Sequence, residues 1–224
     1  MLVLAFDTTA AACSVAVVRD GACIGRAQAV ADHGQAESLM PMIKGTMRES
    51  GIAYADLDRI AVTVGPGSFT GLRIGLAAAR ALGLAAGKPV IGVSSLEVLA
   101  AAVPAPERER NETVLCAIDT KRGDLYLQLF AARDLAPGGE PIALLPSELE
   151  QWLPGGNTVV VGDGTGEVLK ALPKLTVSAA SPLPDPLILA RLAAVRTPSV
   201  DGPLPLYVLA PKVTLAPGGG RLRQ

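Results

Sequence analysis

The feature that most constrains the fold is a short repeat at the head of each half of the chain. Ala5-Phe6-Asp7-Thr8 reappears as Ala117-Ile118-Asp119-Thr120. Each copy ends an apolar segment of strand character and leads through a turn into a second such segment. Matching residues at equivalent places indicate two similar domains. The 224 residues, of which 50% are hydrophobic, are enough for two small domains without a stabilising metal or disulfide.

The first half alternates between strand-like and helix-like hydrophobic patterns. Asp20-Gly21 is typical of a hairpin turn between two strands, while Gly51 and Gly87 each follow a predicted helix. These patterns predict the order βββαβαβα. The strands are residues 2–6, 13–19, 22–29, 59–64 and 90–93, and the helices are residues 35–50, 70–86 and 95–102.

A segment rich in proline and charge, residues 104–113, separates the two halves. The patterns behind it are weaker and predict strands 114–119, 125–131 and 158–162, with helices 147–153, 165–172 and 186–194. We therefore assign residues 1–103 to an N-terminal domain and residues 104–215 to a smaller C-terminal domain. Residues 216–224 are expected to form a disordered tail.

A glycine-rich loop, residues 65–71, lies between a predicted strand and a predicted helix. Such a loop can hold a phosphate, because helix N-termini present free N–H groups. It lacks the Lys of a Walker A loop and the Gly-x-Ser-x-Gly of a nucleophile elbow, and Gly65, Gly67 and Gly71 are spaced too widely for a dinucleotide fingerprint. We interpret the loop as a sharp turn that allows close backbone approach, with Ser68 or Thr70 capping the helix.

Composition excludes several classes of function. The net charge of −1 shows no basic excess for independent nucleic-acid binding, and an aromatic content of 3% leaves little for base stacking. The three cysteines have no metal-binding spacing, which is typical of a reduced cytoplasmic protein. No apolar run long enough to cross a membrane avoids charge and glycine, so no membrane segment is expected.

Four segments within residues 1–102 are distinctive: AFDTTAAACSVAVV, HGQAESLMPMI, GPGSFTGLRIGLAAARALG and PVIGVSSLEVLA. They resemble the TsaB (YeaZ) family, a glycoprotease-like family in the actin, hexokinase and sugar-kinase superfamily. The second half is similar by layout and by AIDTKRGDLYLQLF, but in PLYVLAPKV Leu209 stands where the family pattern has Arg. The resemblance implies two RNase H-like α/β domains of the actin/hexokinase (ASKHA) type.

The resemblance also implies a role in the bacterial complex that forms threonylcarbamoyladenosine in tRNA, next to the anticodon. The chain would be a non-catalytic scaffold that pairs with and activates a TsaD-type catalytic subunit. TsaD-type proteins hold a metal through V-N-H-x-x-x-H, and Ser95 and Leu99 occupy the two histidine positions here. Neither side chain can replace an imidazole ligand.

The chain alone is therefore expected to bind no cofactor or metal. ATP, Mg²⁺ and the metal would belong to the partner subunits, which include a TsaE-type ATPase, and tRNA would be reached only through the complex. Whether the isolated chain forms a homodimer is not decided by the sequence.

Two predicted helices carry the expected partner surface. Methionines gather in the first, and methionine suits both irregular cores and adaptable binding faces. Small residues recur every four positions in the second, which permits close approach either to the chain's own sheet or to a partner. In TsaB relatives both helices face a partner, so the resemblance favours an interface made by His33, Glu37, Met40, Ile43, Met47, Gly71, Gly75 and Ala79.

Asp7, Thr8 and Thr9 stand where kinase relatives handle phosphate and Mg²⁺, which makes them candidate nucleotide-binding residues. The same residues are equally typical of a turn, because Asp and Thr hydrogen-bond the local backbone. Two alternatives to the scaffold remain. A small-molecule kinase would need this site, and a glycoprotease-like hydrolase with a Ser-His-Asp triad would need His33, the one histidine of the chain.

Overall fold

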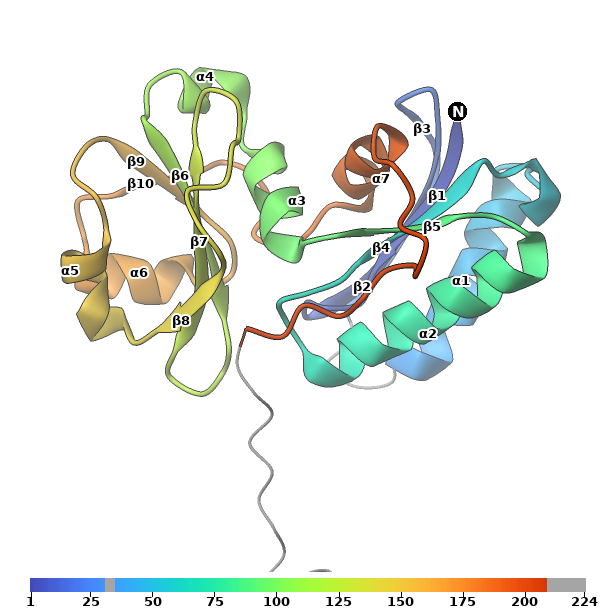
Figure 1. Ribbon diagram of the computed structural model, residues 1–224, viewed down its shortest axis with the longest axis horizontal. Helices are drawn as coiled ribbons and strands as arrows, with labels where there is room; N and C mark the ends of the chain where they lie inside the picture. Colours follow the sequence, from blue (N-terminus) through green and yellow to red (C-terminus); the bar gives the residue numbers. More distant parts are fainter. Residues whose placement is uncertain (31–34, 209–224) are drawn as a thin grey trace, which may run out of the picture.

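The computed structural model describes residues 1–30 and 35–208, which form two α/β domains lying side by side (Figure 1). The first domain is built on a five-stranded sheet with the order β3-β2-β1-β4-β5. β1, β2 and β3 pair antiparallel, whereas β4 and β5 continue the sheet parallel to β1. The strands are β1 (Leu2–Asp7), β2 (Ala12–Arg19), β3 (Ala22–Val30), β4 (Arg59–Thr63) and β5 (Val90–Val93).

The second sheet repeats this plan. Its order is β10-β9-β6-β7-β8, with β6 antiparallel to β7 and parallel to β9. Read from its third strand to its fifth, each domain therefore has the order 3-2-1-4-5, which confirms the duplication and the RNase H-like fold expected from the sequence. The strands are β6 (Thr113–Asp119), β7 (Leu125–Ala131), β8 (Ile142–Leu144), β9 (Thr158–Val161) and β10 (Thr176–Val177).

Helices cover both faces of the first sheet. α1 (Gln35–Glu49) and α2 (Phe69–Ala86) pack on the face that receives Leu4 and Phe6 of β1. The alternate residues Val3 and Ala5 point to the other face and pack against α7 (Pro186–Ala194). α2 is long and apolar enough to cross a membrane by composition alone, but it packs along β4 as a core helix.

The second sheet is also covered on both faces. α3 (Ser95–Ala102) contributes Leu96, Leu99 and Ala100 to the core on one face of this sheet. The sequence prediction assigns this helix to the first domain. α5 (Leu149–Trp152) and α6 (Thr165–Ala171) lie on the other face. Since Val98 of α3 packs instead with the α7 cluster, this helix joins the cores of both domains. Three shorter elements complete the described part of the chain: the 3₁₀ turns Tyr54–Asp56 and Pro146–Glu148, and α4 (Ala105–Arg108).

Of residues 104–215, which the sequence assigns to a C-terminal domain, β6 to β10 form the second sheet, whereas α7 and Leu206 return to the first domain and contradict the assignment there. Leu189 and Ala193 of α7 are fully buried against the first sheet. Beyond α7, the backbone N–H of Leu206 donates to the carbonyl of Val64 at 2.7 Å. The predicted tail, residues 216–224, lies outside the described residues.

Smaller differences concern short elements. The predicted helix 147–153 is a 3₁₀ turn followed by the single turn of α5, and the predicted linker contains α4. β8 and β10 are too short to produce a strand pattern in the sequence.

Candidate site in the interdomain cleft

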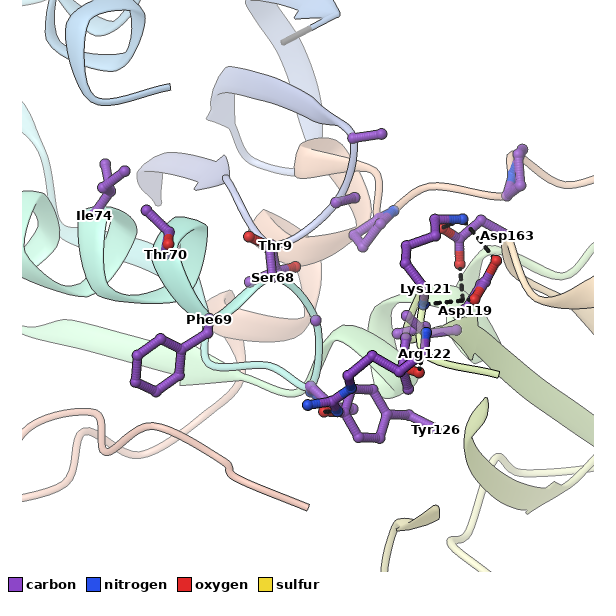
Figure 2. Close-up of a pocket in the computed structure, with 18 of the residues that line it drawn as sticks. Thr9, Ser68, Phe69, Thr70, Ile74, Asp119, Lys121, Arg122, Tyr126 and Asp163 are labelled. Atoms are coloured by element: carbon purple, nitrogen blue, oxygen red, sulfur yellow. Dashed lines mark hydrogen bonds and ion pairs between the residues drawn. The ribbon is translucent and has the colours of Figure 1, made fainter. Parts of the chain in front are cut away.

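A cavity of about 690 Å³ opens between the two domains. The first domain lines it with the turn after β1 and with the start of α2. The second lines it with the β6–β7 turn and with Asp163, which follows β9. Figure 2 shows Thr9 and Ser68 on one side, with Lys121, Asp119 and Asp163 on the other. A cleft with polar groups from both walls is the strongest candidate site in the described part of the chain.

On the first-domain side of the cleft, the carboxylate of Asp7 is buried. Asp7 is 1% exposed, and its Oδ1 accepts hydrogen bonds from the hydroxyls of Thr9 and Thr63 and from the backbone N–H of Thr9. Burial raises the pKa of Asp7, although these hydrogen bonds oppose the rise. Thr8 is also buried, and its hydroxyl donates to the Gly71 carbonyl at 2.7 Å. Of the three predicted nucleotide-binding residues, only Thr9 lines the cleft, because the side chains of Asp7 and Thr8 make internal contacts. Nucleotide binding by these residues stays a prediction.

The glycine loop packs directly on this turn. The backbone N–H of Ser68 donates to the Thr9 carbonyl at 2.7 Å, and a Cβ on Gly67 would lie 2.5 Å from that same oxygen. Gly67 also has a φ of 157°, which side chains rarely adopt. The Ser68 hydroxyl caps α2 by accepting from the Gly71 N–H. The loop therefore serves close backbone approach, as the sequence indicated.

The second-domain wall carries a cluster of three charges that the sequence reasoning missed. Lys121 Nζ lies 2.8 Å from Oδ2 of Asp119 and 3.8 Å from Oδ2 of Asp163. The other Asp163 oxygen, Oδ1, accepts the backbone N–H of Asp119 at 2.9 Å. A signal was present, because Asp119 ends β6 and Asp163 follows β9, and the carboxyl ends of these parallel strands meet at one edge of the sheet.

The two carboxylates of this cluster titrate differently. Burial opposes ionisation of Asp119, but the side-chain and backbone hydrogen bonds from Lys121 outweigh it and hold the pKa of Asp119 below its ordinary value. Burial raises the pKa of Asp163, against the hydrogen bond from Asp119 and the charge of Lys121. The single lysine ammonium thus offsets one of the two negative charges that the aspartates carry when both are ionised.

These residues do not fit a Mg²⁺–nucleotide complex, the ligand that the kinase alternative requires. The Lys121 ammonium lies against the two carboxylates that a cation would need. The turn N–H groups are also taken: those of Lys121 and Arg122 donate to Asp119 Oδ1 and Thr120 Oγ1. Within residues 1–30 and 35–208, no three His, Cys, Asp or Glu side chains lie close enough together to hold a metal.

The two residues that the sequence aligns with the histidines of TsaD-type proteins, Ser95 and Leu99, are both buried and do not line the cavity. Ser95 is fully buried, and its hydroxyl is 3.0 Å from that of Thr9. Leu99 packs in the apolar core under the second sheet. Neither side chain offers a metal ligand with the basicity of an imidazole.

Most of the predicted interface residues lie inside the chain's own core. Ile43 and Met47 pack under the first sheet. Gly75 faces Thr8, where an added Cβ would lie 2.5 Å from Oγ1, and Gly71 and Ala79 are buried along the same side of α2. The prediction that these residues face a partner is therefore wrong, because the small side chains let α2 approach its own sheet. The residues concerned are Ile43, Met47, Gly71, Gly75 and Ala79.

The remaining interface predictions have a different outcome. Glu37 and Met40 are exposed on α1, so their contact with a partner stays a prediction. His33 lies outside the described residues.

Comparison with known proteins places these features in a family. The family model for TsaD, tRNA N6-adenosine threonylcarbamoyltransferase, matches residues 28–136. The tRNA threonylcarbamoyladenosine biosynthesis protein TsaB of Escherichia coli K12 is 37% identical over 56% of this chain, and the match spans only about half (53%) of that protein.

The structural comparison extends over nearly the whole chain. YeaZ from Pseudomonas aeruginosa superposes with a TM-score of 0.77 at 30% identity, covering 92% of this chain and 99% of that one. An inorganic polyphosphate/ATP-glucomannokinase from Arthrobacter, with a TM-score of 0.52 and 12% identity over 87% of this chain and 98% of its own, shares the two-domain fold. The chain belongs to the TsaB (YeaZ) family.

Proposed function

We propose that this chain is a non-catalytic subunit in the formation of threonylcarbamoyladenosine in tRNA. The observation that carries the proposal is the loss of groups for metal binding. In the cleft, Lys121 lies against Asp119 and Asp163, and the buried Ser95 and Leu99 stand where the paralogue has its metal-binding histidines. A related protein that has lost the groups for metal chemistry is best explained as a supporting subunit.

The working partner in this proposal is a TsaD-type catalytic subunit, in the cytoplasm, with a TsaE-type ATPase in the same complex. The partners supply ATP, Mg²⁺ and the metal, and tRNA contacts the chain only through the complex. The names of the relatives support this assignment, and the exposed Glu37 and Met40 of α1 offer the partner a surface beside α2.

The alternatives have less support. A kinase would need Asp7 and Thr8 to contact phosphate, but both side chains are buried in internal hydrogen bonds. A hydrolase with a Ser-His-Asp triad would depend on His33, the one histidine of the chain, and the serine that lines the cleft, Ser68, caps α2 with its hydroxyl.

Reconstitution tests the proposal. The purified chain, a TsaD-type subunit and a TsaE-type ATPase are combined with tRNA, ATP and a threonylcarbamoyl donor, and modified adenosine is measured by mass spectrometry. We expect transfer only when the chain and the TsaD-type subunit are both present. Transfer by this chain alone, or equal transfer in its absence, would contradict the proposal.

A further inference from the structure

Helix α3 is the element through which the two domains are connected. It follows β5 directly, and Leu96 and Leu99 pack under the second sheet, whereas Val98 packs with the α7 cluster of the first. Figure 1 shows the helix between the two sheets. The chain returns to the first domain between β10 and α7, past Pro182 and Pro184. Two chain crossings by themselves permit hinge rotation, so the contacts of α3 determine how firmly the domains are held.

Three polar contacts connect the first turn of α3 with the first domain, among the residues that the structure describes. The backbone N–H of Ser95 donates to the Gly65 carbonyl at 2.8 Å. The Ser95 hydroxyl lies 3.0 Å from the Thr9 hydroxyl, and the carboxylate of Glu97 pairs with Arg196, which follows α7. The main-chain bond fixes the point where the helix begins, and the two side-chain contacts restrain its direction.

The hydroxyl contact belongs to a chain of hydrogen bonds with one direction. The Thr9 hydroxyl donates its single proton to Asp7 Oδ1 at 2.6 Å. It can therefore only accept from Ser95, so donation runs from Ser95 through Thr9 to Asp7. The Thr63 hydroxyl and the backbone N–H of Thr9 donate to the same Asp7 oxygen, which holds the accepting end of the chain in place.

Burial makes this chain of hydrogen bonds costly to break. Ser95 is fully buried, and Thr9 is the one polar partner of its hydroxyl within residues 1–30 and 35–208. A rotation of the second domain that carried α3 away from Thr9 would leave the Ser95 donor buried without a partner. Thr9 also lines the cavity between the domains, whose width such a rotation would change.

We propose that the chain Ser95–Thr9–Asp7 is an interdomain latch, which fixes the orientation of the second domain and thereby the width of the cleft. Ser95 stands where the paralogue has a metal-binding histidine, so this position joins two domains here instead of binding a metal. The inference does not rest on the proposed function, because the latch lies within the chain and needs no partner subunit.

Residual dipolar couplings of the full chain, measured by NMR, test the latch because they report the orientation of each domain. We expect one alignment to describe both sheets of the unmodified chain. Ser95→Ala and Thr9→Val remove one hydroxyl each and should release the second domain, so that the couplings of β6, β7 and β9 shrink relative to those of β1, β2 and β4. Thr9→Ser keeps the hydroxyl and should keep the shared alignment.

Thr46→Val is the matched control, because it removes a comparably buried hydroxyl within one domain. Thr46 is 2% exposed and donates to the Met42 carbonyl inside α1 at 2.9 Å. This variant should keep the shared alignment even if it melts at a lower temperature.

Three results would overturn the latch. They are a shared alignment that survives in Ser95→Ala, equal loosening of the domains in Thr46→Val, and independent domains in the unmodified chain. Thr9→Val also loses the hydrogen bond from its hydroxyl to Asp7. If that variant fails to fold, Ser95→Ala decides, because it leaves the bond between Thr9 and Asp7 intact.

Discussion

Replacing Gly75 by alanine is the sharpest test of how α2 packs. The added Cβ would lie 2.5 Å from Thr8 Oγ1 and 3.4 Å from Val62 Cγ2. Cβ atoms are not found that close to another heavy atom, so either α2 moves away from the sheet or the Thr8 hydroxyl rotates. Rotation breaks its 2.7 Å hydrogen bond to the Gly71 carbonyl.

The magnitudes decide the sign of the effect. Alanine favours a helix interior over glycine by about 1 kcal/mol. Overpacking a core costs about 1–3 kcal/mol, and a buried hydroxyl that loses its partner adds about 1–3 kcal/mol. We therefore expect Gly75→Ala to lower the free energy of unfolding by about 2 kcal/mol, measured by urea denaturation.

A matched control and a double-mutant cycle isolate the contact. Gly45 lies inside α1 with nothing within 4 Å of an added Cβ, so Gly45→Ala should stabilise the chain. In a Thr8→Ala background the clashing oxygen is gone, and Gly75→Ala should cost at least about 1 kcal/mol less than in the original chain. A Gly75→Ala protein as stable as Gly45→Ala would refute the internal packing and restore the partner interpretation of these small residues.

Four further predictions concern charge, ligand binding and the core. The folded chain binds a proton at Asp7 more tightly than the unfolded chain does, so proton binding stabilises the fold. This stabilisation is complete below the unfolded pKa of 3.8 and is lost as pH rises through the raised folded pKa. Asp7→Asn should therefore gain stability relative to the original chain with rising pH, and a pH-independent difference in melting temperature would contradict this. Lys121→Met should raise the pKa of Asp119 in an NMR titration. Calorimetry of the unmodified chain with millimolar Mg²⁺–ATP should give no binding heat, and binding that Asp119→Asn abolishes would refute our interpretation of the cleft. Leu189→Ala should cost about 2–5 kcal/mol of unfolding free energy, whereas the exposed Leu204→Ala should change it by less than about 0.5 kcal/mol; equal effects would mean that α7 does not cover the first sheet.

The sequence predicted local structure and duplication well, because both depend on short-range patterns. The recurrence of Asp7 as Asp119 marked two equivalent strand ends, and Asp20-Gly21 marked a hairpin that the structure contains. The glycine loop was also interpreted correctly, because its spacing excluded the known phosphate motifs and left backbone approach as the remaining reason for Gly67.

The site was predicted less well, since residues distant in sequence build it. In the sequence, Lys121 has the pattern of an ordinary turn residue. Only the pairing of β6 with β9 places Asp163 near its ammonium group. Asp7 appeared suited to a cation because its sequence context shows a carboxylate after a strand. Whether that carboxylate faces the cleft depends on Thr63, which the fold places against it from a neighbouring strand.

The same limit explains the error in the domain boundary. The hydrophobic pattern of α7 identifies an apolar face that must be buried, but it contains no information on which of two similar sheets will bury it. The first sheet had α1 and α2 on one face only, so its second face, with Val3 and Ala5, required a cover from elsewhere in the chain. Most of α3 packs under the second sheet, so α7 is the helix that covers the second face of the first sheet. The same return brings the segment after α7 back to the first domain, where the Leu206 N–H donates to the Val64 carbonyl. The error in the domain boundary is thus a consequence of how two duplicated sheets share their helices.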